Sequence, residues 1–141
     1  MAEQLPHIES GDVDYLLVVL PDAGNTGEDR AVAKGAITYV EVPGSGVLTQ
    51  LSVVDEMRSH GFGSLLVRSM EHRIRDRGSG RAEIAVELDN PRARRLDERL
   101  GFVAYDERPA SWMQTGPDGQ RYRYHTICTW LAETLTEHGD H

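Results

Sequence analysis

The spacing Arg58-x-x-Gly61-x-Gly63 carries the clearest chemistry in this 141-residue chain. It stands where a strand-like apolar pattern gives way to a helix-like one. The first amides of a helix have no internal acceptors and carry partial positive charge, and glycine leaves room for an anion to approach them. The spacing therefore predicts a phosphate or pyrophosphate site at the start of a helix.

Three known phosphate-binding loops compete for this stretch. A P-loop requires Gly-Lys followed by Ser or Thr, and no lysine occurs here. A dinucleotide fingerprint requires a third glycine at position 66, which is Leu66, and it follows a strand of a parallel series. An antiparallel hairpin is expected before this loop instead. The third candidate is the loop, with Arg or Gln ahead of two small residues, that holds the pyrophosphate of coenzyme A.

Periodicity places this loop within an α/β fold. Strand-like stretches alternate with two helical ones, and Asn90-Pro91 is a typical cap and first turn for the second helix. The order predicts a mixed sheet in which antiparallel hairpins flank one β-α-β crossover. The expected strands cover residues 12–20, 31–42, 47–54, 81–88, 102–114 and 121–131, and the expected helices cover 61–77 and 91–100.

The apolar spacing also predicts which faces are buried. In the first helix the stripe at three- and four-residue steps comprises Phe62, Leu65, Leu66, Met70 and Ile74. Glu71 and Arg75 are expected to form an i,i+4 pair on its surface, and Gly78 is expected to end it. In the strand that follows, and in the second helix, the expected apolar positions are Ile84, Val86 and Leu88, then Ala93, Leu96 and Leu100.

Two motifs in register resemble those of the GNAT superfamily of acyl-CoA-dependent N-acyltransferases. Leu51-x-Val53 followed by the Arg58 loop looks like the central motif of that family. Asn90-x-x-Ala93-x-x-Leu96-x-x-x-Leu100-Gly101-Phe102 is similar to its second motif, with one strand between the two. The resemblance covers residues 12–131 and implies one GNAT-like domain over residues 1–141. Only eleven residues precede the first strand, so the N-terminal helices of the family are expected to be shortened or absent.

The resemblance implies acetyl-CoA as co-substrate and assigns residues to it. The central strand would lie beside the pantetheine arm, and the loop amides would hold the pyrophosphate. Asn90 would contact the pantetheine arm or fix the start of its helix, and Arg94 or Arg95 could reach the adenosine phosphate. The implied cofactor-binding residues are Leu51, Ser52, Val53, Arg58, Ser59, His60, Gly61, Phe62, Gly63, Ser64, Asn90 and Arg94.

The family mechanism is direct attack of an amine on the thioester, and three residues are candidates for its proton transfers. Asp97 stands where the family often has a tyrosine that protonates the departing thiolate. A solvated carboxyl group is ionised at neutral pH, so Asp97 could serve only if burial raised its pKa. Tyr105 is another candidate donor. Glu41, expected on the strand beside the central one, is the best-placed carboxylate for a base, although a solvent-facing role fits it as well.

The charge distribution limits the partners. The chain has 23 acidic residues against 15 Lys and Arg, a formal net charge of −8, yet residues 58–99 hold ten Arg against seven acids. A nucleic-acid binder needs a broad positive face, which this distribution does not offer. A local basic region suits a small multivalent anion. The expected acceptor is a small-molecule amine or a basic peptide.

Further expectations concern location, metal and assembly. The longest apolar run, residues 15–20, is too short to span a bilayer, and the first residues do not resemble a signal peptide. Together with a single cysteine, Cys128, this predicts a cytoplasmic protein that does not enter membranes. His138 and His141 suit a polar tail better than a metal site, so no metal is expected. The acceptor cleft is either open or completed by a second subunit, which would make a homodimer. An acyl-CoA-binding sensor with little turnover is the alternative to an enzyme.

Overall fold

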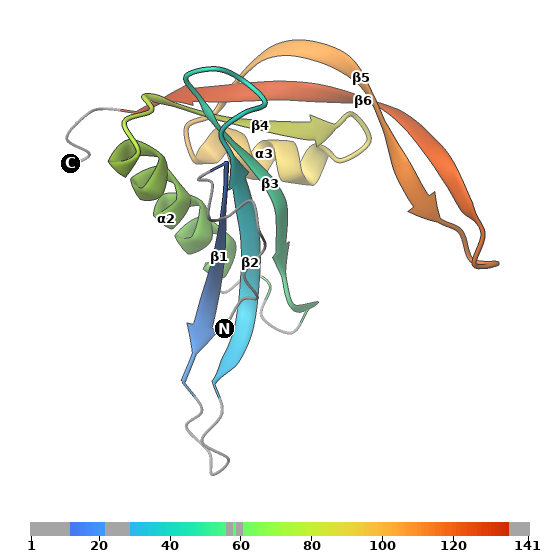
Figure 1. Cartoon of the computed structure of the whole chain (residues 1–141), viewed down its shortest axis with the longest axis horizontal. Coiled ribbons are helices and arrows are strands. Elements are labelled where there is room, and N and C mark those ends of the chain that lie inside the picture. The colour runs from blue at the N-terminus through green and yellow to red at the C-terminus, as the bar shows by residue number, and fades with distance from the viewer. Residues whose placement is uncertain (1–11, 22–28, 56–57, 59–60, 136–141) are drawn as a thin grey trace. The chain divides into compact units, whose positions relative to one another are not determined.

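The computed structural model describes residues 12–21, 29–55, 58 and 61–135, and the element order confirms the α/β class (Figure 1). Two compact units divide the chain, one reaching to Ala82 and including Thr134 onward, the other covering residues 83–133. The elements are β1 (Val13–Leu20), β2 (Arg30–Thr38), β3 (Gly46–Val53), α2 (Phe62–Asp76), β4 (Arg81–Glu87), α3 (Pro91–Arg99), β5 (Val103–Thr115) and β6 (Arg121–Thr134).

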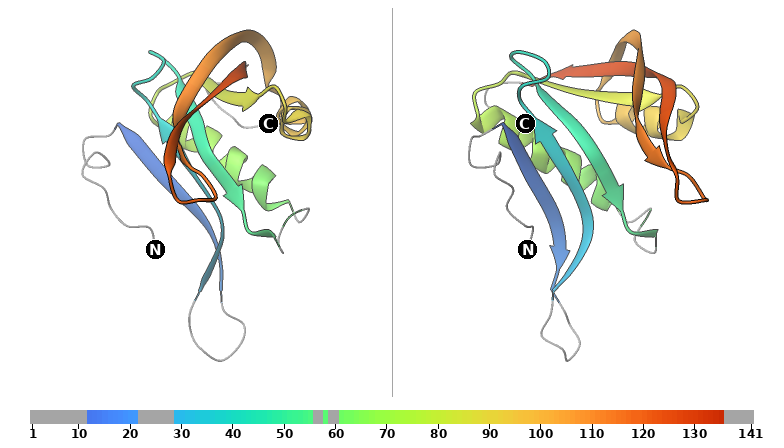
Figure 2. Two further views of the ribbon diagram at one scale, coloured as in Figure 1. Left: turned by 90° about the vertical axis from the view of Figure 1, so that its right-hand side faces the viewer. Right: turned by 45° about the vertical axis from the view of Figure 1, so that its right-hand side comes forward.

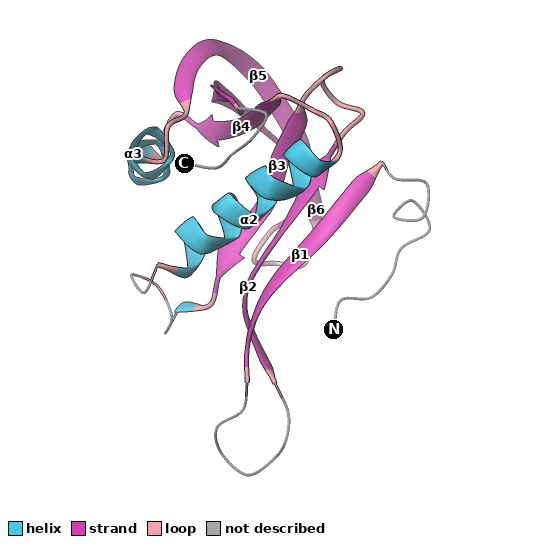
Figure 3. Ribbon diagram, turned by 90° about the vertical axis from the view of Figure 1, so that its left-hand side faces the viewer, coloured by secondary structure: helices cyan, strands magenta, loops and turns pink. Residues whose placement is uncertain are grey.

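The first unit is an antiparallel sheet in the order β1-β2-β3, with α2 packed against all three strands (Figure 3). Helix and sheet approach closely because glycines lie between them. A Cβ on Gly46 would stand 2.6 Å from Ile74 Cγ1, so no larger residue fits there without movement. A tight turn joins β2 to β3, with the amide of Ser45 donating to the carbonyl of Val42 at 3.1 Å.

Helix α2 buries a different stripe from the one predicted. Leu66, Met70 and Ile74 are buried as expected, but Leu65 is 50% exposed and Val67 is buried in its place. Glu71 was expected on the surface; it is buried and accepts two bonds from Arg68, at 2.9 and 2.8 Å. Residues 66, 70 and 74 form one row along the helix, and the buried face can include the residues on either side of that row. Packing on the sheet buries the side that holds residues 67 and 71. The helix ends as predicted, before Gly78, where the amide of Ser79 bonds to Ile74 at 3.1 Å.

In the second unit β6 lies between β4 and β5, and the hairpin of β5 and β6 forms a long curved ribbon (Figure 2). All three strand pairs with a defined register, β1–β2, β2–β3 and β5–β6, are antiparallel, which confirms the mostly antiparallel sheet. Ile84 and Val86 are buried as predicted, but Leu88 is exposed because β4 ends at Glu87. In α3 the expected apolar residues are half-buried, and Asp97 is its buried residue.

Candidate functional site

The N-terminus of α2 has the open geometry that the glycine spacing predicts. Gly61 precedes the helix in a left-handed conformation, with φ 84° and ψ 4°, which glycine adopts without strain. Among the described residues no side chain caps this end, and no acidic residue stands in the first turn. A Cβ on Gly61 would meet nothing within 4 Å, and one on Gly63 would come only to 3.8 Å from Val53. First-turn amides have no intrahelical acceptor, so this helix end is of the kind that binds anions.

The residues before Gly61 are only partly described. The backbone amide of Arg58 donates to Asp55 at 3.2 Å, and its guanidinium lies 3.1 Å from the Asp55 carboxylate. Both side chains are largely exposed, so water weakens the attraction between them. The predicted contacts Ser59 and His60 lie outside the described residues.

Strand β3 leads into this loop, and its last three residues are the predicted Leu51, Ser52 and Val53. Just before them Gln50 has φ 58°, a left-handed conformation that costs a non-glycine residue on the order of 1 kcal/mol. The register between β2 and β3 shifts at the same level, between Lys34 and Ala36. Such bulges re-aim the backbone and are frequent next to active sites. Sequence reasoning missed this feature because glutamine gives no signal of a positive φ.

Glu41 is not on a strand, contrary to the sequence prediction. Strand β2 ends at Thr38, and Glu41 is an exposed residue of the β2–β3 connection, where it accepts a bond from Thr38 at 3.4 Å. Thr38 pairs with Val47 near the start of β3, whereas the glycine loop follows the end of that strand. The strand is cut short because Pro43 and Gly44 form a turn, in which Gly44 has φ 79°.

The N-terminus of α3 is capped by the side chain of Asn90. The Oδ1 atom of Asn90 accepts a bond from the amide of Ala93 at 3.2 Å, which confirms Asn90 as the predicted helix cap. Arg94 is close to Glu98, with Nε and Oε2 3.2 Å apart, and both side chains are exposed. The cap uses the amide oxygen of Asn90, so the NH₂ group is the part that could donate to a ligand.

Asp97 is buried and has a raised pKa, as a proton donor at this position requires. Its side chain is only 5% exposed, and burial raises the pKa of its carboxyl group from 3.8 to about 6, with a smaller contribution from the charge of Glu98. At neutral pH about one molecule in ten then carries the proton at this site. Tyr105 is the weaker donor, because its hydroxyl already donates to the buried carboxylate of Glu83.

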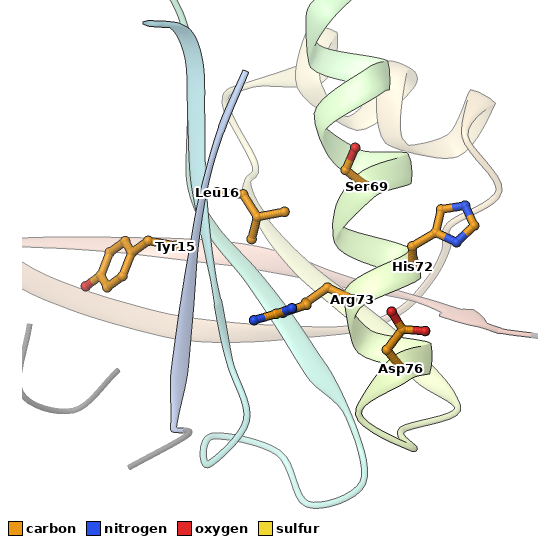
Figure 4. A pocket seen from close by; sticks show the side chains of 6 residues that line it. All are labelled: Tyr15, Leu16, Ser69, His72, Arg73 and Asp76. Atoms are coloured by element: carbon orange, nitrogen blue, oxygen red, sulfur yellow. The ribbon is translucent and has the colours of Figure 1, made fainter. Parts of the chain in front are cut away.

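The surface is hollowed in each of the two units. The first, about 370 Å³, lies between β1 and α2 and is lined by Tyr15, Leu16, Ser69, His72, Arg73 and Asp76 (Figure 4). Next to it the buried Asp14 is bonded by Tyr39 at 2.8 Å and by Arg73 at 3.1 Å. The Asp14 carboxylate thus has its partners within the protein, and its bond with Arg73 joins β1 to α2. The second hollow, about 440 Å³, is lined by Leu88, Asp89, His125, Thr126 and Ile127.

Neither a metal cluster nor a membrane helix is found in the part of the chain that the structure describes. No three His, Cys, Asp or Glu residues there gather closely enough to hold a metal ion. No helix among the same residues is both long and apolar enough to cross a bilayer.

Comparisons with known proteins identify the family. The family model of FR47-like proteins matches residues 16–112. N-alpha-acetyltransferase 30 of Schizosaccharomyces pombe is 31% identical over 77 residues, which are 55% of this chain and 51% of that protein. The chain thus matches about half the length of this curated relative.

Solved structures share the fold. The ribosomal-protein-S18-alanine N-acetyltransferase of Escherichia coli matches with a TM-score of 0.62 and 18% identity, covering 89% of this chain and 70% of that one. A spermidine N-acetyltransferase of Vibrio cholerae matches with a TM-score of 0.61 and 17% identity, covering 91% of this chain and 69% of that one. Because the family model covers well over half of the sequence, the chain belongs to the FR47-like family of the GNAT superfamily.

Proposed function

We propose that this chain is an N-acetyltransferase that moves an acetyl group from acetyl-CoA to a primary amine. The observation that carries the proposal is the open first turn of α2 behind the left-handed Gly61, in a chain of this family. A diphosphate brings two negative charges to a helix end where the described residues supply no side-chain cap and the first turn has no acidic residue. The curated relative, which this chain matches over about half its length, also acts as an acetyltransferase by its name.

The proposed cofactor contacts follow the sequence assignment, within one domain that covers residues 1–141. The loop from Arg58 to Ser64 holds the pyrophosphate, and Leu51 to Val53 lie along the pantetheine arm. The strained backbone at Gln50 supports this arrangement, because it interrupts the β2–β3 ladder beside those residues. On α3, Asn90 contacts the arm through its NH₂ group and Arg94 approaches the adenosine phosphate.

The proposed reaction is a direct attack of the acceptor amine on the thioester carbonyl. A C–N bond forms, the C–S bond breaks, and the electron pair of the broken bond leaves with the thiol sulfur. Asp97, buried and with a raised pKa, supplies the proton that the thiolate takes up. Glu41 is exposed in the β2–β3 connection, away from the loop end of β3, so we assign removal of the amine proton to water instead.

The acceptor is proposed to be a cationic small-molecule amine or a basic peptide, which suits a chain of net charge −8. By their names, one relative is an N-alpha-acetyltransferase, and two proteins of the same fold act on an alanine of ribosomal protein S18 and on spermidine. The single cysteine favours a cytoplasmic location. The homodimer stays a prediction.

A second candidate is an acyl-CoA-binding sensor with little turnover. It is favoured by Asp97 at the position where the family often has tyrosine, and by the hydroxyl of Tyr105 being held by Glu83. Release of free thiol from acetyl-CoA, measured across a panel of amines, peptides and polyamines, separates the two candidates. Turnover on any member supports the enzyme, and tight binding without turnover supports the sensor.

A thermal-shift comparison tests the cofactor itself. Coenzyme A should raise the melting temperature, because a ligand that binds only the folded state stabilises it, whereas NAD and ATP should not. If coenzyme A leaves the melting temperature unchanged at saturating concentration, both candidates fail.

A further inference from the structure

The 440 Å³ hollow of the second unit lies where β4 ends. The amide of Leu88 donates to the carbonyl of Ile127 at 3.0 Å, and this bond joins the chain after β4 to β6. Beyond that point the chain turns through Asp89 into the cap of α3 at Asn90. The hollow therefore lies directly before the residue proposed to contact the pantetheine arm, so an acceptor held there is close to that residue in the same unit.

Two carboxylates, Glu87 and Asp89, give this place a negative charge. Asp89 lines the hollow, and Glu87 precedes it by two residues at the end of β4. Among the described residues neither carboxylate has an ion-pair partner; the one side-chain bond to Glu87 comes from the uncharged hydroxyl of Tyr124, at 2.8 Å. The field reaches their neighbours, since both carboxylates contribute to raising the pKa of the Cys128 thiol, after its burial.

Two aromatic side chains, Trp112 and Tyr124, lie next to each other on the β5–β6 ribbon beyond the hollow. Trp112 and Tyr124 are register partners, and their ring centroids are 5.2 Å apart. Thr126, which lines the hollow, is two residues from Tyr124 and so shares its face of the sheet. Trp112 keeps 36% of its surface exposed, although aromatic side chains of this size are usually covered. Carboxylates beside an aromatic face are the chemistry that binds an alkylammonium ion.

We propose that this hollow anchors the second, non-reacting ammonium group of a linear polyamine acceptor. The inference rests on the proposed function and deepens it by naming the substrate class. The reacting amine must lose its proton before it attacks, whereas an ammonium beside Glu87 and Asp89 keeps its proton. The alkyl chain lies against Tyr124 and Trp112. A short cation fits better than a long basic peptide, because Arg121 and Arg123 on the outer half of β6 repel further positive charge.

The test is a calorimetric titration of the full chain with spermidine, with and without coenzyme A. Glu87→Gln and Asp89→Asn remove the charges while keeping the size of the side chains. We expect each to weaken spermidine binding about tenfold and the pair to weaken it about fiftyfold. Asp118→Asn, which changes an exposed carboxylate in the turn between β5 and β6, is the matched control and should leave binding unchanged. Equal binding to wild type and to the double variant overturns the proposal.

Steady-state kinetics distinguish this proposal from the proposed function. We expect the double variant to raise the KM for spermidine about fiftyfold, with kcat and the KM for acetyl-CoA nearly unchanged. Butylamine, which has one amine, should show no such dependence. A preference for basic peptides over spermidine overturns the polyamine assignment. If spermidine binding depends on Glu87 but no amine is turned over, the result supports the ammonium site and contradicts the proposed acetyltransferase function. Should Glu87→Gln fail to fold, the exposed Asp89→Asn carries the test alone.

Discussion

Helices α2 and α3 begin in the same chemical situation, but their first-turn amides are treated differently. Each presents first-turn amides with partial positive charge. At α3 the side chain of Asn90 accepts from the amide of Ala93, and Pro91 occupies the first turn, where no donor is needed. At α2 a left-handed Gly61 precedes the helix; none of the residues described around it caps the helix with a side chain, and the first turn holds no acidic residue. A cap stabilises the helix at its own end, whereas an uncapped, unobstructed end leaves stabilisation for a ligand to provide.

Gly61→Asp should have the largest effect on cofactor affinity, because it gives α2 the kind of acidic residue that caps helices and repels anions. The carboxylate would enter the open space at the loop and repel the diphosphate. We expect affinity for coenzyme A to fall about a hundredfold or more, measured by calorimetry. The fold should survive with a loss of about 1 kcal/mol, since aspartate at positive φ is strained but tolerated.

Gly44→Asp is the matched control for that substitution. Gly44 has φ 79°, like the 84° of Gly61, and a Cβ there would also meet nothing within 4 Å. It lies in the β2–β3 turn, away from the loop. The two variants should lose similar stability while only Gly61→Asp loses affinity. Equal affinities would show that the amides at α2 do not hold the diphosphate.

Asp97→Asn tests the buried charge of α3, and its effect should depend on pH. Because the folded state raises the pKa of Asp97 from 3.8 to about 6, the folded protein holds this proton more tightly than the unfolded chain. Stability from this group is present below pH 4 and is lost as the pH rises to about 6. We expect Asp97→Asn to match wild type near pH 4 and to exceed it by about 2 kcal/mol at pH 7.5.

Urea unfolding at several pH values provides this measurement. A stability difference that does not vary between pH 4 and 7.5 would show that Asp97 is not the titrating group. Turnover gives a second readout, because a rate that depends on protonated Asp97 should fall as the pH rises through about 6, and the Asn variant should lose that dependence.

The comparison of helix ends also shows what the sequence could predict. Caps and turn residues act locally, so Asn90, Gly61 and Gly78 marked the helix boundaries correctly. The choice of buried stripe depends on the sheet beneath. Residues 65 and 67 flank Leu66 equally in the sequence, and only tertiary packing decided that Val67 is buried and Leu65 exposed.

In the candidate site, too, the sequence predicted the features that depend on neighbouring residues and missed those that depend on distant ones. The glycine loop was predictable because its chemistry lies in neighbouring residues. The left-handed Gln50 was not, because its strain comes from a register shift against β2. The hollow near Asp89 brings together the end of β4 and residues 125–127 of β6, nearly forty positions later. Glu41 was misplaced for a local reason: its β-compatible neighbours outweighed the turn signal of Pro43-Gly44.

Asn90→Ala removes the cap that distinguishes α3. We expect a loss of about 1 kcal/mol in the free energy of unfolding, because the amide of Ala93 loses its acceptor. Asn90→Ser keeps a capping oxygen but removes the NH₂ group. If Asn90 also contacts the pantetheine arm, the Ser variant should keep its stability and still bind coenzyme A about threefold to tenfold more weakly. Wild-type affinity in the Ser variant would limit Asn90 to capping.

Arg94→Ala should have the smallest effect and tests whether α3 takes any part in binding phosphate. Its pair with Glu98 is exposed, so its loss should change the free energy of unfolding by less than about 0.5 kcal/mol. An exposed guanidinium that reaches the 3′-phosphate of coenzyme A should contribute about threefold to fivefold in affinity at low salt. That contribution must vanish with dephospho-coenzyme A, which lacks this phosphate, and Arg99→Ala, at the other end of α3, is the control. An equal loss for both cofactors would place the effect of Arg94 on the helix rather than on the ligand, and only α2 would then present phosphate-binding groups.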